Sequence, residues 1–147
     1  MTRRRFALAI SAVALIAGLP LVVAAAPAVP TRIRIIKGSR QGPPSVDPKL
    51  QDLSSQLGAL AYQRWEQVGE QQKDLDAGKA VSVALPDGST LEVTLVETRG
   101  NAVTFELRVA AHKTQSRLTI AKDQRIVQQV APEKGGEALF VTVRPWP

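Results

Sequence analysis

Few side chains in this sequence are of a type and spacing that could carry out covalent chemistry. His112 is the only histidine, and the chain has no cysteine. A single chain can therefore build neither a histidine-based triad nor a multi-histidine metal site. We interpret His112 as a surface residue in a polar turn. The sequence predicts no catalytic residue, no metal site and no cofactor.

Carboxylates are the remaining candidates for acid–base chemistry. Asp87 and Glu97 flank predicted turns, and Glu92 falls on the polar side of a predicted strand, opposite Arg108. These are the usual positions of solvated groups. We therefore expect a protein that is not an enzyme, and a hydrolase-type enzyme is the least favoured alternative.

Two groups of polar residues could instead form a binding surface. The first lies on the outer side of a predicted sheet, where threonine and charged residues alternate with apolar ones. The second is a basic group at predicted hairpin tips. If these tips gather at one end of the sheet, they could bind a polyanion such as lipopolysaccharide or an acidic glycan; ordinary solvated hairpin tips are the plainer interpretation. The possible binding surface consists of Thr90, Glu92, Thr94, Glu106, Arg108, Lys113, Arg117, Lys122 and Arg125.

An antiparallel meander is predicted to position these residues, from Ala80 to Ala110. Its apolar residues alternate with polar ones, which is the period of two expected for half-buried strands. All of them fall on odd numbers, and they are Val81, Val83, Leu85, Leu91, Val93, Leu95, Val103, Phe105, Leu107 and Val109. We expect them to share one buried face.

The register of this meander depends on the length of its loops. Only loops with an odd number of residues set apolar positions opposite one another, so three-residue loops are predicted at Asp87–Ser89 and Arg99–Asn101. The resulting pairs are Leu85 with Leu91, Leu95 with Phe105, and Glu92 with Arg108 on the outer side.

A helix is predicted to begin at Ser45 or Asp47, either of which could cap it, with Pro48 in its first turn. An apolar stripe follows at helical spacing, formed by Leu50, Leu53, Leu57 and Leu60. We expect this stripe to cover the buried face of the meander. Residues 62–68 are predicted as a short strand, although an extension of the helix stays open. Further short strands are expected at residues 118–121, 126–130 and 138–143.

These elements predict an α+β fold. One N-terminal helix would pack on an antiparallel β-meander, as a small sandwich or partly open barrel. Three segments follow along the chain: a signal peptide over residues 1–28, a basic linker or edge strand over 29–44, and a helix-plus-antiparallel-sheet domain over 45–147. The basic segment could touch acidic lipid or polymer, or its charges could simply keep an edge strand soluble.

The N-terminus is typical of a signal peptide. Arg3–Arg5 precede an apolar run, and small residues follow a break at Gly18–Pro20. Cleavage is expected after Ala25 or Ala28. The paired arginines also match a twin-arginine export signal, with the Sec route as the alternative. An uncleaved membrane anchor is a further alternative, and membrane contact is expected only in that case.

The distribution of charge bears on the class of partner, and the cysteine content bears on disulfide bonds. The formal net charge is +6, but seven of the 19 basic residues precede residue 41, and the remaining twelve face all 13 acidic residues. A nearly neutral body argues against a nucleic-acid partner. The absence of cysteine means that export brings no disulfides.

The order of several turn signals resembles that of a group of small exported bacterial proteins without an assigned activity. The residues concerned are Ile33–Ile36, Val46–Pro48, Leu85–Gly88 and Gly135–Gly136. The resemblance implies export and a single helix-plus-sheet domain. We therefore expect a non-catalytic envelope protein, periplasmic or secreted, that binds a partner protein or a surface component.

Export can be tested directly. We expect a mature N-terminus at Ala26 or Val29 in the envelope fraction, measured by intact mass. Met1 retained in a membrane fraction would instead establish an anchor. Replacing Arg3 and Arg4 with lysine should reduce export only on the twin-arginine route, so undiminished export would assign the Sec route.

Overall fold

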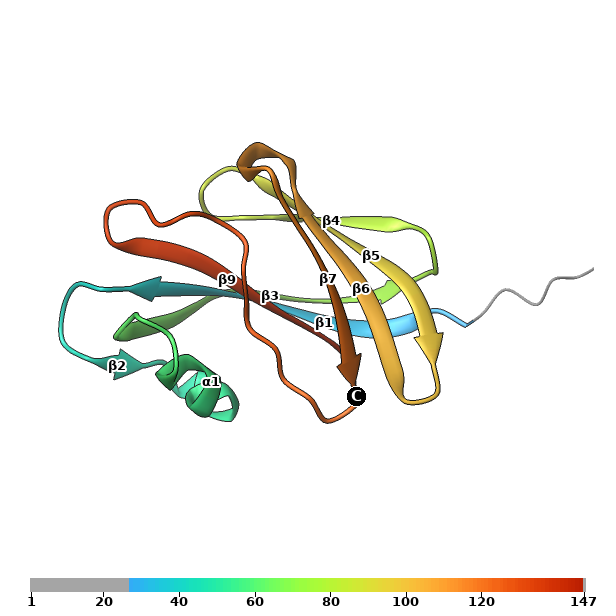
Figure 1. Cartoon of the computed structure of the whole chain (residues 1–147), viewed down its shortest axis with the longest axis horizontal. Coiled ribbons are helices and arrows are strands. Elements are labelled where there is room, and N and C mark those ends of the chain that lie inside the picture. The colour runs from blue at the N-terminus through green and yellow to red at the C-terminus, as the bar shows by residue number, and fades with distance from the viewer. Residues whose placement is uncertain (1–26, 147) are drawn as a thin grey trace, which may run out of the picture.

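The chain folds into two β-sheets that share one core (Figure 1). The computed structural model describes residues 27–146. The first sheet has the strand order β2-β3-β1-β9-β8, and the second has the order β4-β5-β6-β7. Their bounds are β1 Val29–Ser39, β2 Ser45–Val46, β3 Arg64–Leu75, β4 Ala80–Ala84, β5 Thr90–Arg99, β6 Ala102–Val109, β7 Thr114–Ala121, β8 Gln128–Gln129 and β9 Glu137–Pro145.

The predicted α+β fold is wrong, because the protein is mostly β, with 57% strand and 12% helix. The predicted helix is a 3-10 turn, η1 (Pro48–Leu53), followed by one short α-helix, α1 (Ser54–Gly58). Asp47 caps η1, accepting a hydrogen bond from the backbone N–H of Lys49 at 3.0 Å. This helical segment packs on the first sheet instead of covering the meander.

β1 is the central strand of the first sheet, paired with β3 on one side and with β9 on the other. The prediction that residues 29–44 form a linker or an edge strand is therefore wrong. The folded unit begins at β1, well before residue 45. Ile33 and Ile35 alternate with Arg32 and Arg34, but this pattern does not indicate an edge strand. The isoleucines pack in the shared core, and the arginines on the opposite face pair with carboxylates.

The inner face of β1 supplies the layer that the meander needs. Ile33 and Ile35, with Val141 and Val143 of β9, join the odd-numbered apolar residues of β4, β5 and β6 in one buried cluster. Leu91, Val93, Phe105 and Val109 have no exposed surface there. A sheet covers this face in place of the helix because β1 and β9 together present a longer apolar row than a two-turn helical segment does.

A second, smaller core lies on the outer face of the first sheet. The leucines of the helical segment pack there on Ile36, Trp65 and Phe140. The rings of Trp65 and Phe140 meet edge to face, with centroids 5.1 Å apart. A β-carbon at Gly38 would lie 2.8 Å from the Trp65 ring, so only glycine lets that indole lie flat on the strand.

The β4–β5 hairpin keeps the predicted parity but not the predicted pairs. Val83 lies opposite Leu91 and Val81 opposite Val93, a shift of two residues. The three-residue loop is Pro86–Gly88, closed by a hydrogen bond from the Leu85 N–H to the Ser89 carbonyl. Pro86 suits the first turn position and Gly88 has φ +86°, so the loop starts one residue earlier than predicted.

The β5–β6 register is confirmed in the middle of the strands. Leu95 lies opposite Phe105, and Glu92 opposite Arg108. Beyond Leu95 the register shifts by one, because Val96 forms a bulge, and the strands end at Arg99 and Ala102. The predicted three-residue loop is therefore a two-residue turn.

The remaining strand predictions hold unevenly. Residues 62–68 do enter a strand, but β3 extends to Leu75. β7 begins four residues earlier than predicted, and β8 has only two residues. β9 lies inside its sheet, as its apolar residues on both faces predict.

In the part of the chain described here, no helix is long and apolar enough to cross a bilayer. The predicted signal peptide falls almost entirely outside these residues.

The second core gives a direct stability test. Leu57 is fully buried against the first sheet, so Leu57→Ala should lower the free energy of unfolding by about 2 to 5 kcal/mol. Ser54→Ala, on the exposed side of α1, is the control and should change it little. Chemical denaturation measures both, and equal stability of the two variants would contradict a core role for the helical segment.

Candidate functional site

A groove lies at the end of the sandwich where β1 and β9 extend past the second sheet. It consists of two adjoining hollows of about 340 and 350 Å³ that share Lys37 and Glu137. The inner-face row of β1 is apolar at Ile33 and Ile35 but continues as Lys37 and Ser39. The groove therefore begins where the shared core ends. We call it the end groove.

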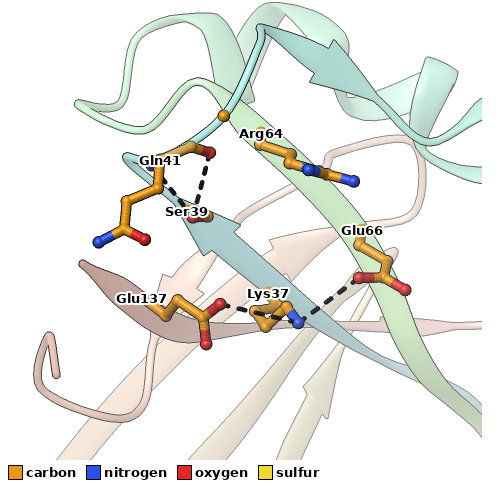
Figure 2. A pocket seen from close by; sticks show the side chains of 7 residues that line it. Lys37, Ser39, Gln41, Arg64, Glu66 and Glu137 are labelled. Atoms are coloured by element: carbon orange, nitrogen blue, oxygen red, sulfur yellow. Dashed lines mark hydrogen bonds and ion pairs between the residues drawn. The ribbon is translucent and has the colours of Figure 1, made fainter. Parts of the chain in front are cut away.

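The first hollow is charged (Figure 2). The Lys37 ammonium lies between two carboxylates, 3.6 Å from Glu66 Oε2 and 4.0 Å from Glu137 Oε1. Cross-strand pairing explains this, since Glu66 faces Lys37 across β3 and β1. Arg64 and Gln41 line the upper part of the hollow (Figure 2). Opposite charges nearly balance, so this hollow suits a polar or zwitterionic group.

The second hollow is mostly apolar. Its floor is formed by Ala131, Pro132 and Leu139, with Pro86 of the β4–β5 turn at one side. Lys134 also lines it and pairs with Glu137 across the two-residue turn Gly135–Gly136 before β9. Among the described residues that line it there is no Phe, Tyr or Trp, the rings on which sugars usually stack, so the hollow suits an aliphatic side chain.

His112 and Asp87 form one wall of the apolar hollow. His112 ends η2 (Ala110–His112), and its Nε2 lies 2.6 Å from Asp87 Oδ2. Asp87 also accepts from the Ser89 N–H at 2.9 Å and the Ser89 hydroxyl at 2.5 Å. Burial acts to raise the pKa of Asp87, but these bonds outweigh it and hold the pKa below the ordinary 3.8. The pair fixes two turns of the second sheet at the groove.

These side chains offer ion pairs, hydrogen bonds and apolar contact. Lys37 is held by two carboxylates, and the Ser89 hydroxyl donates to Asp87. Within residues 27–146, no group of three or more histidine, cysteine, aspartate or glutamate side chains could hold a metal ion.

The predicted binding surface on the meander is present as one face of the second sheet. Thr90, Glu92 and Thr94 lie on β5, and Glu106 and Arg108 on β6. Arg117 of β7 donates to Glu106 at 3.1 Å. These side chains point away from the shared core, so the face assignment survives the changed β4–β5 register.

The predicted basic cluster is divided by the fold. Lys113 precedes β7 and Lys122 follows it, so eight strand residues, roughly 25 Å, separate them. Arg125 lies beyond the end of β7 and is not part of the second sheet. Its Nε is 3.4 Å from Asp52 Oδ2 in the helical segment. The hairpin tips therefore do not gather at one end.

Sequence analysis missed the end groove. Lys37, Glu66 and Glu137 come from three strands, two of which were not predicted at their full length. One signal was available: the inner alternation of β1 changes from isoleucine to lysine and serine before the strand ends. His112 was placed correctly in a turn, but its pairing with Asp87 spans 25 residues and leaves no local signal.

Comparison of the chain with family models, with curated proteins and with solved structures gave no match. The resemblance to small exported bacterial proteins therefore stays a prediction.

The Asp87–His112 contact predicts a pH dependence. A folded-state pKa below the unfolded value means that Asp87 stabilises the fold above about pH 4 and that this contribution is lost as the pH falls through the folded pKa. Asp87→Asn should therefore lower stability at neutral pH and flatten its decline between about pH 5 and 3. Denaturation across that range measures the effect, and Asp123→Asn, in the exposed turn after β7, is the control. Identical curves for Asp87→Asn and the unaltered protein would contradict this role.

Proposed function

We propose that this chain is a non-catalytic protein of the cell envelope, periplasmic or secreted, that binds a segment of a partner protein in the end groove. The observation that carries the proposal is the junction of an apolar and a charged hollow through Lys37 and Glu137. Export rests on the N-terminal sequence alone.

The lining of the groove favours a polypeptide over a glycan. An extended peptide alternates its side chains, so it can place one aliphatic side chain against Pro132 and Leu139 and a polar one beside Lys37. The combined volume, somewhat under 700 Å³, is at the scale of small recognition pockets. The hydrogen-bonded turns around Asp87 and His112 keep the wall in place, which lowers the ordering cost of binding.

Site-specific photo-crosslinking in the envelope tests this proposal. A photoreactive residue at Pro132 should capture a distinct protein, whereas the same residue at Gln115, exposed on the outer face of the second sheet, should not. Lys134→Glu should reduce the Pro132 adduct because it reverses a charge in the lining of the hollow. The same adduct from both positions, or none from Pro132, would contradict binding in the groove.

A further inference from the structure

Four arginines gather on the outer face of the first sheet, at the opposite end from the end groove. Arg32 of β1 lies directly opposite Arg144 of β9, and Arg34 is two residues along β1. Arg125 reaches the same place from the segment before β8 and shares Asp52 with Arg34. We call this group the arginine cluster.

The cluster carries more positive charge than the carboxylates beside it neutralise. Asp52 forms ion pairs with both Arg34 and Arg125, and Glu70 forms one with Arg32. Arg144 has no ion pair among residues 27–146, although it lies beside three other guanidiniums. Like charges placed directly opposite in a sheet destabilise it. Among the described residues, the four arginines of the cluster therefore lie beside two carboxylates, a surplus of two positive charges.

Arg144 is the unsatisfied member. Its Nε is buried and has no hydrogen-bond partner in the described part of the chain. Burial, followed by the charges of Arg125 and Arg32, lowers the pKa of Arg144 below its ordinary value. A buried donor without a partner costs stability, more so in a charged group. The described part of the fold therefore leaves the Arg144 Nε–H without the acceptor that a buried donor needs.

The cluster is also held in position. The guanidiniums of Arg32 and Arg144 each lie 4.9 Å from the centroid of the Trp146 ring. The backbone N–H of Trp146 donates to the Pro30 carbonyl at 2.7 Å, which ties this residue to the start of β1. The contacts of Arg125, at 3.4 and 3.5 Å, are at the long limit of hydrogen bonding. Arg125 can therefore turn to a ligand at little cost.

We propose that the arginine cluster binds a phosphate group, with Arg144 and Arg125 as its main donors. A phosphate monoester carries about −2 charge, which matches the surplus, and its oxygens accept the paired N–H groups of guanidinium. The phosphate can be free or can belong to a lipid or sugar headgroup. This site is separate from the end groove in face and in position, so it stands whether or not a peptide binds there.

Titration of the purified protein with inorganic phosphate, followed by NMR at constant ionic strength, tests the site. Saturable shifts should appear at the Trp146 indole and the arginine side chains, and acetate should give much smaller ones. Arg144→Gln should weaken phosphate binding roughly tenfold to a hundredfold, as loss of charge-assisted hydrogen bonds does. Arg99→Gln, at the exposed end of β5, is the matched control and should leave it unchanged.

Thermal stability, measured with and without phosphate, distinguishes a ligand-binding Arg144 from a purely structural one. Without phosphate, Arg144→Gln should be at least as stable as the unaltered protein, because it removes an uncompensated charge, but phosphate should no longer raise its Tm. A structural arginine would instead give a lower Tm with and without phosphate.

Glycerol 3-phosphate and vesicles containing phosphatidic acid then distinguish a soluble from a lipid source. Absence of saturable phosphate binding, equal losses in Arg144→Gln and Arg99→Gln, or acetate binding as strong as phosphate binding would overturn the proposal.

Discussion

The burial of Arg34 is the constraint on which the outer face of the first sheet depends. Its side chain is 2% exposed at the centre of the sheet, and every donor group on it finds an acceptor. Gln67 of β3 accepts from Nε, Asp52 accepts from Nη1, and the Lys49 carbonyl accepts from Nη2. Two segments distant in sequence, β3 and η1, are thereby tied to β1.

The attraction between Arg34 and Asp52 is not the main part of this effect. The Asp52 side chain is 39% exposed, so water screens the Coulomb energy of the pair. The larger cost would come from leaving the guanidinium buried without acceptors, about 3 to 5 kcal/mol for a broken buried pair. The helical segment is therefore positioned both by the bonds of Arg34 to η1 and by its leucines, which pack on Ile36 and Phe140.

Features that depend on interactions between residues near in sequence could be predicted, and features that depend on distant residues could not. The meander was predictable because alternation and turn residues act locally, and its two register errors arise at Pro86 in the β4–β5 loop and at the bulge of Val96 in β5. The helical segment was recognised from Asp47 and Pro48, but its place was not, because an apolar stripe does not specify which sheet it covers. β1 was taken for an edge because two charged residues interrupt it, and the partners that make those charges tolerable lie 18 and 38 residues away.

Both candidate sites result from a mismatch in length between β1 and its two covers. At 11 residues β1 is roughly 36 Å long, whereas the 11 residues of η1 and α1 span only about 20 Å of its outer face. The helical segment covers the Ile36 and Gly38 end, and at the other end Arg32 and Arg144 lie against Trp146 instead. On the inner face the second sheet covers Ile33 and Ile35, and the row continues as the half-buried Lys37 and the buried Ser39, which line the end groove. Since residues alternate between the faces, one strand presents arginines on one side at its start and a lysine on the other near its end, so two ligands of different chemistry could bind without sharing a residue.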